Sequence, residues 1–304
     1  MGDLTERGGA APADGILCLD KPQEMTSFSC CAVFRRLLGV RKIGHAGTLD
    51  PMATGVLPLL VGRATRALEL LPDHSKRYTA TLRFGFISDT QDVWGAVTPT
   101  GGAAPSRRAV EEALPAFRGA IRQIPPMMSA LKMDGVRLYD LARQGIEVER
   151  EARPVTVHTL ELVAYDEEAG ELTLDCACSR GTYIRTLCTD LGERLGCGAV
   201  MTALRRTRAA GYSLDQCVTL DQARSLAEAG TLPARLMPVD SAFSACGKVT
   251  VSPAQAARFR NGGALALDRL PAVTGLTRVY APGGAFLGLG RPAGGEMKIA
   301  RLFV

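Results

Sequence analysis

The sequence lacks an apolar run long enough to cross a membrane as a helix. Such a helix needs about 18 apolar residues, whereas the longest apolar stretch, GVLPLLVG at 55–62, is far shorter. The first 14 residues contain acids but no apolar segment, which is unlike a signal peptide and typical of a disordered tail. We therefore expect a cytoplasmic protein without a membrane segment.

The sequence also lacks the cysteine and histidine spacings of disulfide frameworks and zinc sites. It has nine cysteines, an odd number, and no C-x-x-C pair. Its three histidines, His45, His74 and His158, are too scattered to be ligands of one zinc ion. We therefore expect no metal, and we expect most cysteines to be small core side chains.

What the sequence does contain is a globular composition with an uneven distribution of charge. Hydrophobic residues make up 46% and charged residues 22%, which is enough for a sizeable core. Residues 248–304 hold eight Lys or Arg and two Asp or Glu, whereas residues 1–247 hold 28 and 29. A basic terminal segment favours a polyanionic partner, although a solubilising surface fits the same charges.

The patterns along the chain divide it into a tail, a main domain and a small terminal domain. The boundary falls at LMPVDSAFSACGK, where Pro, Ser and Gly follow a helical stretch. Beyond it, short apolar pieces broken by Gly and Pro predict a small β-barrel. We predict a disordered tail at 1–14, a main domain at 15–245 and a terminal domain at 248–304.

Both helical and strand patterns occur in the main domain. Residues 26–39 have a helical apolar face, with Thr26 or Ser27 as the cap and Gly39 at the end. Alternating patterns predict strands at 77–85 and 171–181, and a helix is predicted at 182–196, directly after the second strand. Since strands and helices do not alternate regularly, an α+β fold is favoured over a doubly wound sheet.

The most informative stretch is KIGHAGTLDPMATGVLPLLVGRATR at 42–66, where Gly44, Gly47, Gly55 and Pro51 surround one acid, Asp50. Glycine lets the backbone approach a ligand closely, and Pro51 restricts Asp50 to an extended conformation. The loop can therefore present a carboxylate at a fixed angle, although an ordinary Asp-Pro turn has the same residues.

Four motifs in the chain resemble those of one enzyme family. They are LDKPQEMTS, HAGTLDPMATGVLPLLVG, KRYTATLRFG and SRGTYIRTLCTDLGERLGCGA, at 19–27, 45–62, 76–85 and 179–199. On these motifs, the chain from about 15 to 304 resembles the bacterial tRNA pseudouridine-55 synthases of the TruB type. The resemblance implies a mixed, largely antiparallel sheet flanked by helices, a thumb-like insertion at about 124–155 and a C-terminal PUA-like domain that holds RNA.

The resemblance also implies an activity: isomerisation of the T-loop uridine at position 55 of tRNA to pseudouridine, without a cofactor. Asp50 matches the family's catalytic aspartate. A free carboxyl has a pKa of about 3.9, so it is ionised at pH 7 without a separate base. It can add to C6 of the base or to C1′, or assist deprotonation at C2′, and the sequence leaves these routes open.

Two more residues match catalytic positions of the family. Arg185 matches the arginine that pairs with the aspartate and keeps it ionised, aided by the N-terminus of its helix. Tyr78 matches the tyrosine that stacks on the target base. From the residues alone, a solvated helix arginine and a core aromatic are the alternatives.

Further positions match the family's base pocket, its border and its RNA surface. Tyr183 and Leu204 match pocket residues, with plain packing as the alternative. His45 matches a histidine against the RNA loop. Lys21 and Asp20 match supporting or RNA-contacting residues, and an acid near the site is matched by Asp92. Candidates for phosphate contacts, or else for solvated surface, are Arg41, Lys42, Arg63, Arg66, Lys76, Arg205, Arg206, Arg208, Arg258, Arg260, Arg278 and Arg291.

Two residues depart from the family pattern. Glu24 replaces a glycine, which argues against a glycine-specific turn, and Met128 replaces a tyrosine, which removes an aromatic contact.

Three other functions fit parts of the sequence. They are an RNA-binding or RNA-folding protein without essential catalysis, an N-glycosidase, and a synthase for another RNA site. We expect a stand-alone monomer with tRNA as its partner.

Overall fold

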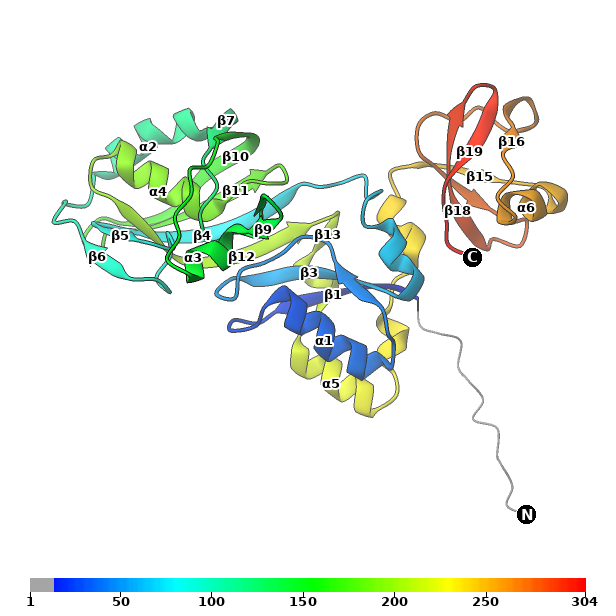
Figure 1. Ribbon diagram of the computed structural model, residues 1–304, viewed down its shortest axis with the longest axis horizontal. Helices are drawn as coiled ribbons and strands as arrows, with labels where there is room; N and C mark the ends of the chain where they lie inside the picture. Colours follow the sequence, from blue (N-terminus) through cyan, green and yellow to red (C-terminus); the bar gives the residue numbers. More distant parts are fainter. Residues whose placement is uncertain (1–13) are drawn as a thin grey trace, which may run out of the picture.

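The computed structural model describes residues 14–304 as a large mixed sheet followed by a smaller one (Figure 1). The tail predicted at 1–14 lies outside the described residues except for Asp14, whose carboxylate pairs with Arg63. No helix within this described range is long and apolar enough to cross a membrane.

The large sheet has ten strands in the order β14-β1-β3-β12-β4-β11-β10-β7, with β2 beside β3 and β13 beside β12. Within residues 14–304, its β1–β14 and β3–β12 pairs are parallel and its other pairs antiparallel. The predicted mixed, largely antiparallel sheet is therefore confirmed. The strands are β1 (Gly15–Lys21), β2 (Ile43–His45), β3 (Thr54–Val61), β4 (Lys76–Phe84), β7 (Gly119–Gln123), β10 (Arg153–Asp166), β11 (Glu171–Cys178), β12 (Ala199–Ala209), β13 (Tyr212–Ser213) and β14 (Cys217–Val218).

Helices flank this sheet in two groups. Helices α1 and α5 lie together beside β1 and β2, and α4 packs against β12 and β4. Thr26 caps α1 and Gly39 ends it in the left-handed conformation, as predicted. The helices are α1 (Ser27–Leu38), α2 (Arg107–Ala113), α3 (Leu138–Arg143), α4 (Ile184–Arg194) and α5 (Leu220–Glu228).

Short elements connect these larger ones. Two small hairpins are formed by β5 (Phe86–Ser88) with β6 (Val97–Pro99), and by β8 (Lys132–Met133) with β9 (Val136–Arg137). The 3-10 helices are η1 (Gly62–Ala67), η2 (Leu114–Phe117), η3 (Leu214–Gln216), η4 (Leu232–Arg235), η5 (Val239–Phe243) and η6 (Leu267–Arg269).

The core lies around the central strands. Strand β3 is buried from residue 55 to 61, as befits a strand in the middle of a covered sheet. Strand β4 alternates as predicted and buries Tyr78, Ala80, Leu82 and Phe84. Seven of the nine cysteines are buried and all nine are free, which confirms their expected role as small core side chains.

The terminal segment forms a five-stranded sheet that curls into a half-barrel, in the order β15-β17-β18-β19-β16. It has its own core around Val249, Phe259 and Leu287. Leu289 and Phe303 instead pack into a cluster with Ile16 of β1, which joins the two sheets. The elements are β15 (Gly247–Thr250), α6 (Pro253–Arg260), β16 (Leu265–Ala266), β17 (Thr277–Tyr280), β18 (Phe286–Ala293) and β19 (Glu296–Leu302).

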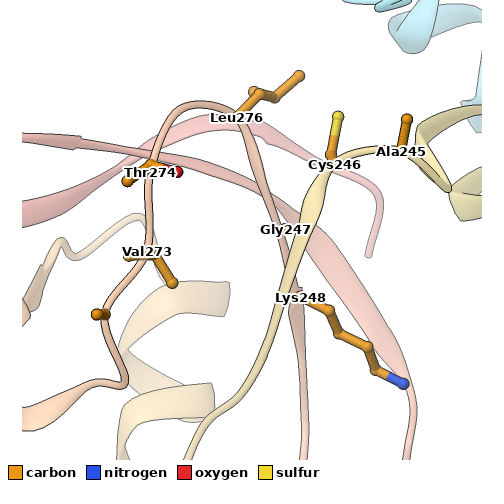
Figure 2. A pocket seen from close by; sticks show the side chains of 8 residues that line it. Ala245, Cys246, Gly247, Lys248, Val273, Thr274 and Leu276 are labelled. Atoms are coloured by element: carbon orange, nitrogen blue, oxygen red, sulfur yellow. The ribbon is translucent and has the colours of Figure 1, made fainter.

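A pocket opens on the terminal sheet between residues 245–248 and 272–276 (Figure 2). Lys248, at its edge, lies with its ammonium 4.7 Å from the ring centre of Tyr280. The pocket belongs to a different sheet from the one that carries Asp50. The domain limits at 15–245 and 248–304 stay predictions.

Candidate active site

The loop that carries Asp50 joins β2 to β3 and is held at both sides. Ser27, the first residue of α1, accepts a hydrogen bond from the Leu49 amide at 2.8 Å and donates one to its carbonyl at 3.1 Å. The carbonyl of Asp50 accepts a hydrogen bond from the Ala53 amide at 3.0 Å. These contacts fix the backbone on both sides of the carboxylate.

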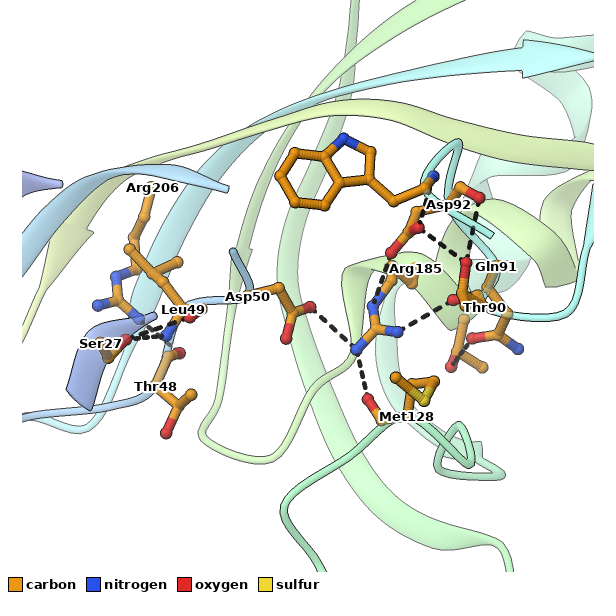
Figure 3. A network of polar contacts seen from close by, with 12 residues as sticks. Ser27, Thr48, Leu49, Asp50, Thr90, Gln91, Asp92, Met128, Arg185 and Arg206 are labelled. Atoms are coloured by element: carbon orange, nitrogen blue, oxygen red, sulfur yellow. Dashed lines mark hydrogen bonds and ion pairs between the residues drawn. The ribbon is translucent and has the colours of Figure 1, made fainter. Parts of the chain in front are cut away.

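The carboxylate of Asp50 forms an ion pair with Arg185, the second residue of α4 (Figure 3). Arg185 Nη2 lies 2.9 Å from Asp50 Oδ2. The side chain of Arg185 is only 5% exposed, whereas that of Asp50 is 36% exposed. A buried cation therefore holds an acid that still has an open side.

Arg185 makes further contacts through each of its three nitrogens. Nη2 donates to the Met128 carbonyl at 2.8 Å, and Nη1 donates to the Thr90 carbonyl at 3.0 Å. Nε lies 3.8 Å from the carboxylate of Asp92. Three loops distant in sequence thus converge on one planar guanidinium, which fixes its orientation.

These neighbours act on the proton affinity of Asp50 in opposite directions. Burial raises the pKa of Asp50, Arg185 lowers it, and the charge of Asp92 raises it again. The net direction is upward. Asp50 therefore relies on Arg185 to favour its ionised form, whereas a carboxyl at the surface is ionised by water alone.

Asp92 is buried, and its carboxylate is fixed by its own loop. Its Oδ1 accepts hydrogen bonds from the Thr90 hydroxyl at 2.8 Å and from the Trp94 amide at 3.0 Å. Its Oδ2 faces Arg185. The sequence placed Asp92 near the site without a specific role, and the structure places it on a second edge of the same guanidinium.

Lys21 supports the Asp50 loop from beneath. Its ammonium has no exposed surface and donates to the carbonyls of Pro22 and Met25 at 2.7 Å and of Pro51 at 3.3 Å. Burial lowers the pKa of Lys21 to about 8. Of the two roles predicted for Lys21, support fits this position, and direct RNA contact is wrong because no atom reaches the surface.

Glu24 adopts the backbone conformation that the sequence argued against. Its φ is 65°, in the left-handed region, and its amide donates to the Pro51 carbonyl at 2.9 Å. The turn that glycine would form easily is therefore kept with a side chain present, at a conformational cost.

Arg206 is misassigned as a phosphate contact. It is 0% exposed, and its guanidinium donates to the carbonyls of Val56 at 2.7 Å, Gly47 at 3.0 Å and Thr48 at 3.3 Å. Arg206 is thus an internal brace for the loop that leads to Asp50. Strand periodicity is the signal for this, because Leu204 and Arg206 share one face of β12.

Tyr78 and Leu204 are both buried in the main core cluster, which also contains Leu49 of the Asp50 loop. Tyr78 lies opposite Arg206 in the sheet register. Burial raises the pKa of the Tyr78 hydroxyl to about 12, and the charge of Asp50 acts in the same direction. The phenol is therefore neutral at pH 7 and within electrostatic reach of Asp50.

Tyr183 is tied to β7 by a residue that the sequence did not single out. The side-chain amide of Gln123 accepts from the Tyr183 amide at 3.0 Å and donates to the Tyr183 carbonyl at 3.1 Å. Burial raises the pKa of the Tyr183 hydroxyl. Gln123 thus fixes the backbone of Tyr183, which lies two residues before Arg185 at the start of α4. No local pattern in the sequence indicates this long-range contact.

His45 ends β2 and is half-buried next to the same loop. Burial and the charge of Arg206 lower the pKa of its imidazole. Its Nδ1 is buried and has no hydrogen-bond partner within residues 14–304. Contact between His45 and an RNA loop stays a prediction.

Most of the other phosphate candidates are at the surface, although some are already paired. Arg205 binds the carboxylate of Asp20 at 2.7 Å, and Arg258 donates to the Ala264 carbonyl. RNA contact by these residues stays a prediction. Exposed candidates are Arg41, Lys42, Arg63, Arg66, Arg208, Arg258, Arg260 and Arg291, and half-exposed ones are Lys76, Arg205 and Arg278.

The described part of the chain contains no group of three or more His, Cys, Asp or Glu placed to hold a metal ion. Asp50 and Asp92, the two acids of this site, share Arg185 instead.

Three family models match the chain in succession. Residues 35–184 match the N-terminal domain of TruB family pseudouridylate synthases. Residues 185–244 match the C-terminal domain of tRNA pseudouridylate synthase B, and residues 247–303 match a C-terminal model of pseudouridine synthase II TruB. The chain belongs to the TruB family of pseudouridylate synthases.

TruB relatives resemble the chain over nearly its whole length. Three of these relatives, each named tRNA pseudouridine synthase B, come from Dechloromonas aromatica, Aromatoleum aromaticum and Pseudomonas fluorescens. The first is 47% identical over 93% of this chain and 93% of its own. The second is 45% identical over 91% and 88%, and the third is 44% identical over 91% and 90%.

Two solved structures share the fold of this chain, which confirms the predicted fold class. A chain in a Cbf5–Nop10–Gar1 complex has a TM-score of 0.73 and 24% identity, over 96% of this chain and 85% of that one. A chain in an H/ACA RNP bound to a substrate RNA has a TM-score of 0.73 and 22% identity, over 96% and 86%. At such identities the likeness concerns the fold alone.

Proposed function

We propose that the chain is a tRNA pseudouridine synthase that isomerises the T-loop uridine at position 55, with Asp50 as the catalytic carboxylate. The observation that carries the proposal is the 2.9 Å ion pair between Arg185 and an acid that keeps 36% of its side chain exposed. Family membership and relatives named tRNA pseudouridine synthase B support the same reaction.

The reaction breaks the N1–C1′ bond of uridine and forms a C5–C1′ bond. The proton on C5 leaves and N1 gains one, so atoms balance without an oxidant, and this proposal includes neither a metal nor an organic cofactor. Asp50 attacks C6 or C1′, or assists removal of a proton at C2′. Each route needs an ionised carboxylate that touches the nucleoside. Arg185 favours the ionised form of Asp50 and orients its carboxylate.

The target base must leave its stack to reach Asp50, which costs a few kcal/mol. Stacking on one aromatic ring contributes about 1–3 kcal/mol, and we assign this role to Tyr78. A neutral phenol with a pKa of about 12 can also carry a proton during the reaction. Tyr183 and Leu204 would line the pocket, and His45 would face the RNA loop.

The rest of the proposal concerns how the tRNA is held and where. The exposed basic residues near the Asp50 loop, together with Arg258 and Arg260, would bind phosphates, and the terminal sheet would hold the acceptor side. We propose a monomer that acts in the cytoplasm without an obligate protein partner.

Tritium release tests the assignment of Asp50. Transcribed tRNA labelled at uracil C5 should lose tritium to water with the unaltered protein and not with Asp50→Asn. Asp221→Asn is the matched control, because Asp221 also pairs with an arginine but lies at the surface. Normal release by Asp50→Asn would defeat the assignment, and free uracil with abasic RNA would instead indicate a glycosidase.

Mapping pseudouridine in total RNA tests the substrate. A strain without this gene should lose pseudouridine at position 55 of its tRNAs. Loss at another site with position 55 intact would favour a synthase for that site. Full modification everywhere would favour a role in RNA folding.

A further inference from the structure

The hairpin of β5 and β6 and its connecting loop carry an unusual concentration of exposed apolar side chains. Within residues 14–304, ten large apolar side chains are exposed, and four of them are Ile87, Val93, Trp94 and Val97. Scattered single exposures are ordinary, whereas a contiguous apolar surface marks a place where something binds. The same loop contains Asp92.

Trp94 stands out within this group. It is the only tryptophan of the chain, and 52% of its surface is exposed. In the described part of the chain, no aromatic ring and no Lys or Arg is recorded against the face of its indole. About half of Trp94 is therefore accessible to a further ring.

The backbone of Trp94 is fixed at the edge of the site. Its amide donates to the carboxylate of Asp92 at 3.0 Å, and that carboxylate faces Arg185. Arg185 in turn holds Asp50, and Figure 3 shows Asp50 and Asp92 at different edges of the guanidinium. The loop is braced further, since Asp89 accepts from the Ala96 amide at 2.8 Å and Val93 donates to the Met201 carbonyl at 3.0 Å.

We propose that Trp94 is a stacking platform for an RNA base close to the extruded uridine. The inference rests on the proposed function, because extrusion of one base leaves its neighbours without a stacking partner. An indole has a wide π-face and few rotatable bonds, so it binds a base with little loss of freedom. RNA is favoured over a protein partner because Asp92 and Arg185 link the backbone of Trp94 to Asp50, whose exposed side would meet the substrate.

The single tryptophan makes the proposal directly measurable. In Asp50→Asn protein, titration with a T stem-loop RNA should quench the tryptophan fluorescence. Trp94→Ala should weaken RNA binding about tenfold, and Trp94→Phe should weaken it less. The matched control is Phe28→Ala, an exposed aromatic that is 68% accessible on α1, and it should bind RNA normally.

A second measurement identifies the base and excludes a merely structural effect. A set of T stem-loops, each with one abasic nucleotide at a different loop position, is bound to two proteins. One is Asp50→Asn with Trp94 intact, and the other carries Trp94→Ala in addition. At one position the tenfold difference should vanish, because the stacking partner is gone. Circular dichroism and the melting temperature should be the same for both proteins.

The outcomes separate this inference from the proposed function. Equal RNA affinity of the Trp94 and Trp94→Ala proteins, or RNA binding without quenching, would overturn the platform even if pseudouridine is made, and would leave the patch to a protein partner. Quenching with the abasic pattern would support the platform even if the unaltered protein made no pseudouridine, in which case the proposed function fails alone.

Discussion

Arg185 Nη2 lies 2.9 Å from Asp50 Oδ2, and it also donates to the Met128 carbonyl at 2.8 Å. Met128 replaces the tyrosine that the resemblance to the family implies at this position, yet the contact uses its backbone carbonyl and is independent of the side chain. One nitrogen thus joins α4, the Asp50 loop and the 124–155 segment. The charge and position of Asp50 depend on this meeting point.

Replacement of Arg185 by lysine should lower the single-turnover rate by roughly 100-fold. Lysine keeps the charge but cannot reach Asp50, Thr90 and Met128 from one planar group. Rapid-quench assays of pseudouridine formation with excess protein measure the change. Arg224→Lys, in an exposed ion pair with Asp221, should react normally. A lysine variant with the rate of the unaltered protein would show that geometry at position 185 is unimportant.

The pH dependence of the rate should change when Asp92 becomes asparagine. The rate should fall as pH drops through the pKa of Asp50, which burial raises, Arg185 lowers and Asp92 raises. Loss of the Asp92 charge should therefore move this acid limb to lower pH. Rates between pH 4 and 8 test the shift, with Asp89→Asn as the control acid of the same hairpin. A limb that moved upward would contradict the electrostatic argument.

Arg206→Met should destabilise the fold by about 3 kcal/mol or more, because it removes a buried guanidinium that donates to three backbone carbonyls. Urea denaturation measures the loss. Arg208→Met, an exposed arginine on the same strand, should change stability by less than about 0.5 kcal/mol. Near-equal stabilities of the two variants would mean that the brace is dispensable.

Glu24→Gly should stabilise the protein by about 0.5–1 kcal/mol. The left-handed backbone at Glu24 costs roughly 1–2 kcal/mol, and the entropy of glycine in the unfolded chain removes part of the gain. Gln23→Gly, next to it without a positive φ, should destabilise by a similar amount. Thermal melts of the three proteins decide the matter, and a lower melting temperature for Glu24→Gly would refute the strain.

Local patterns in the sequence were sufficient for much of the fold. The cap at Thr26, the left-handed end at Gly39 and the alternation along β4 depend on neighbours within a few residues, which a linear pattern contains. The resemblance of two separate motifs, at 45–62 and 179–199, then singled out Asp50 and its partner Arg185.

Only the tertiary structure decided what the buried polar side chains do. Arg206 and Lys21 look like surface cations in sequence, but the order of the strands places them against the Asp50 loop. There they donate hydrogen bonds to backbone carbonyls of β3 and of the loop that precedes it. Charge pairing and burial are set by chain segments that meet only after folding. A sequence can therefore name Asp50, whereas the packed sheet determines how firmly it is held.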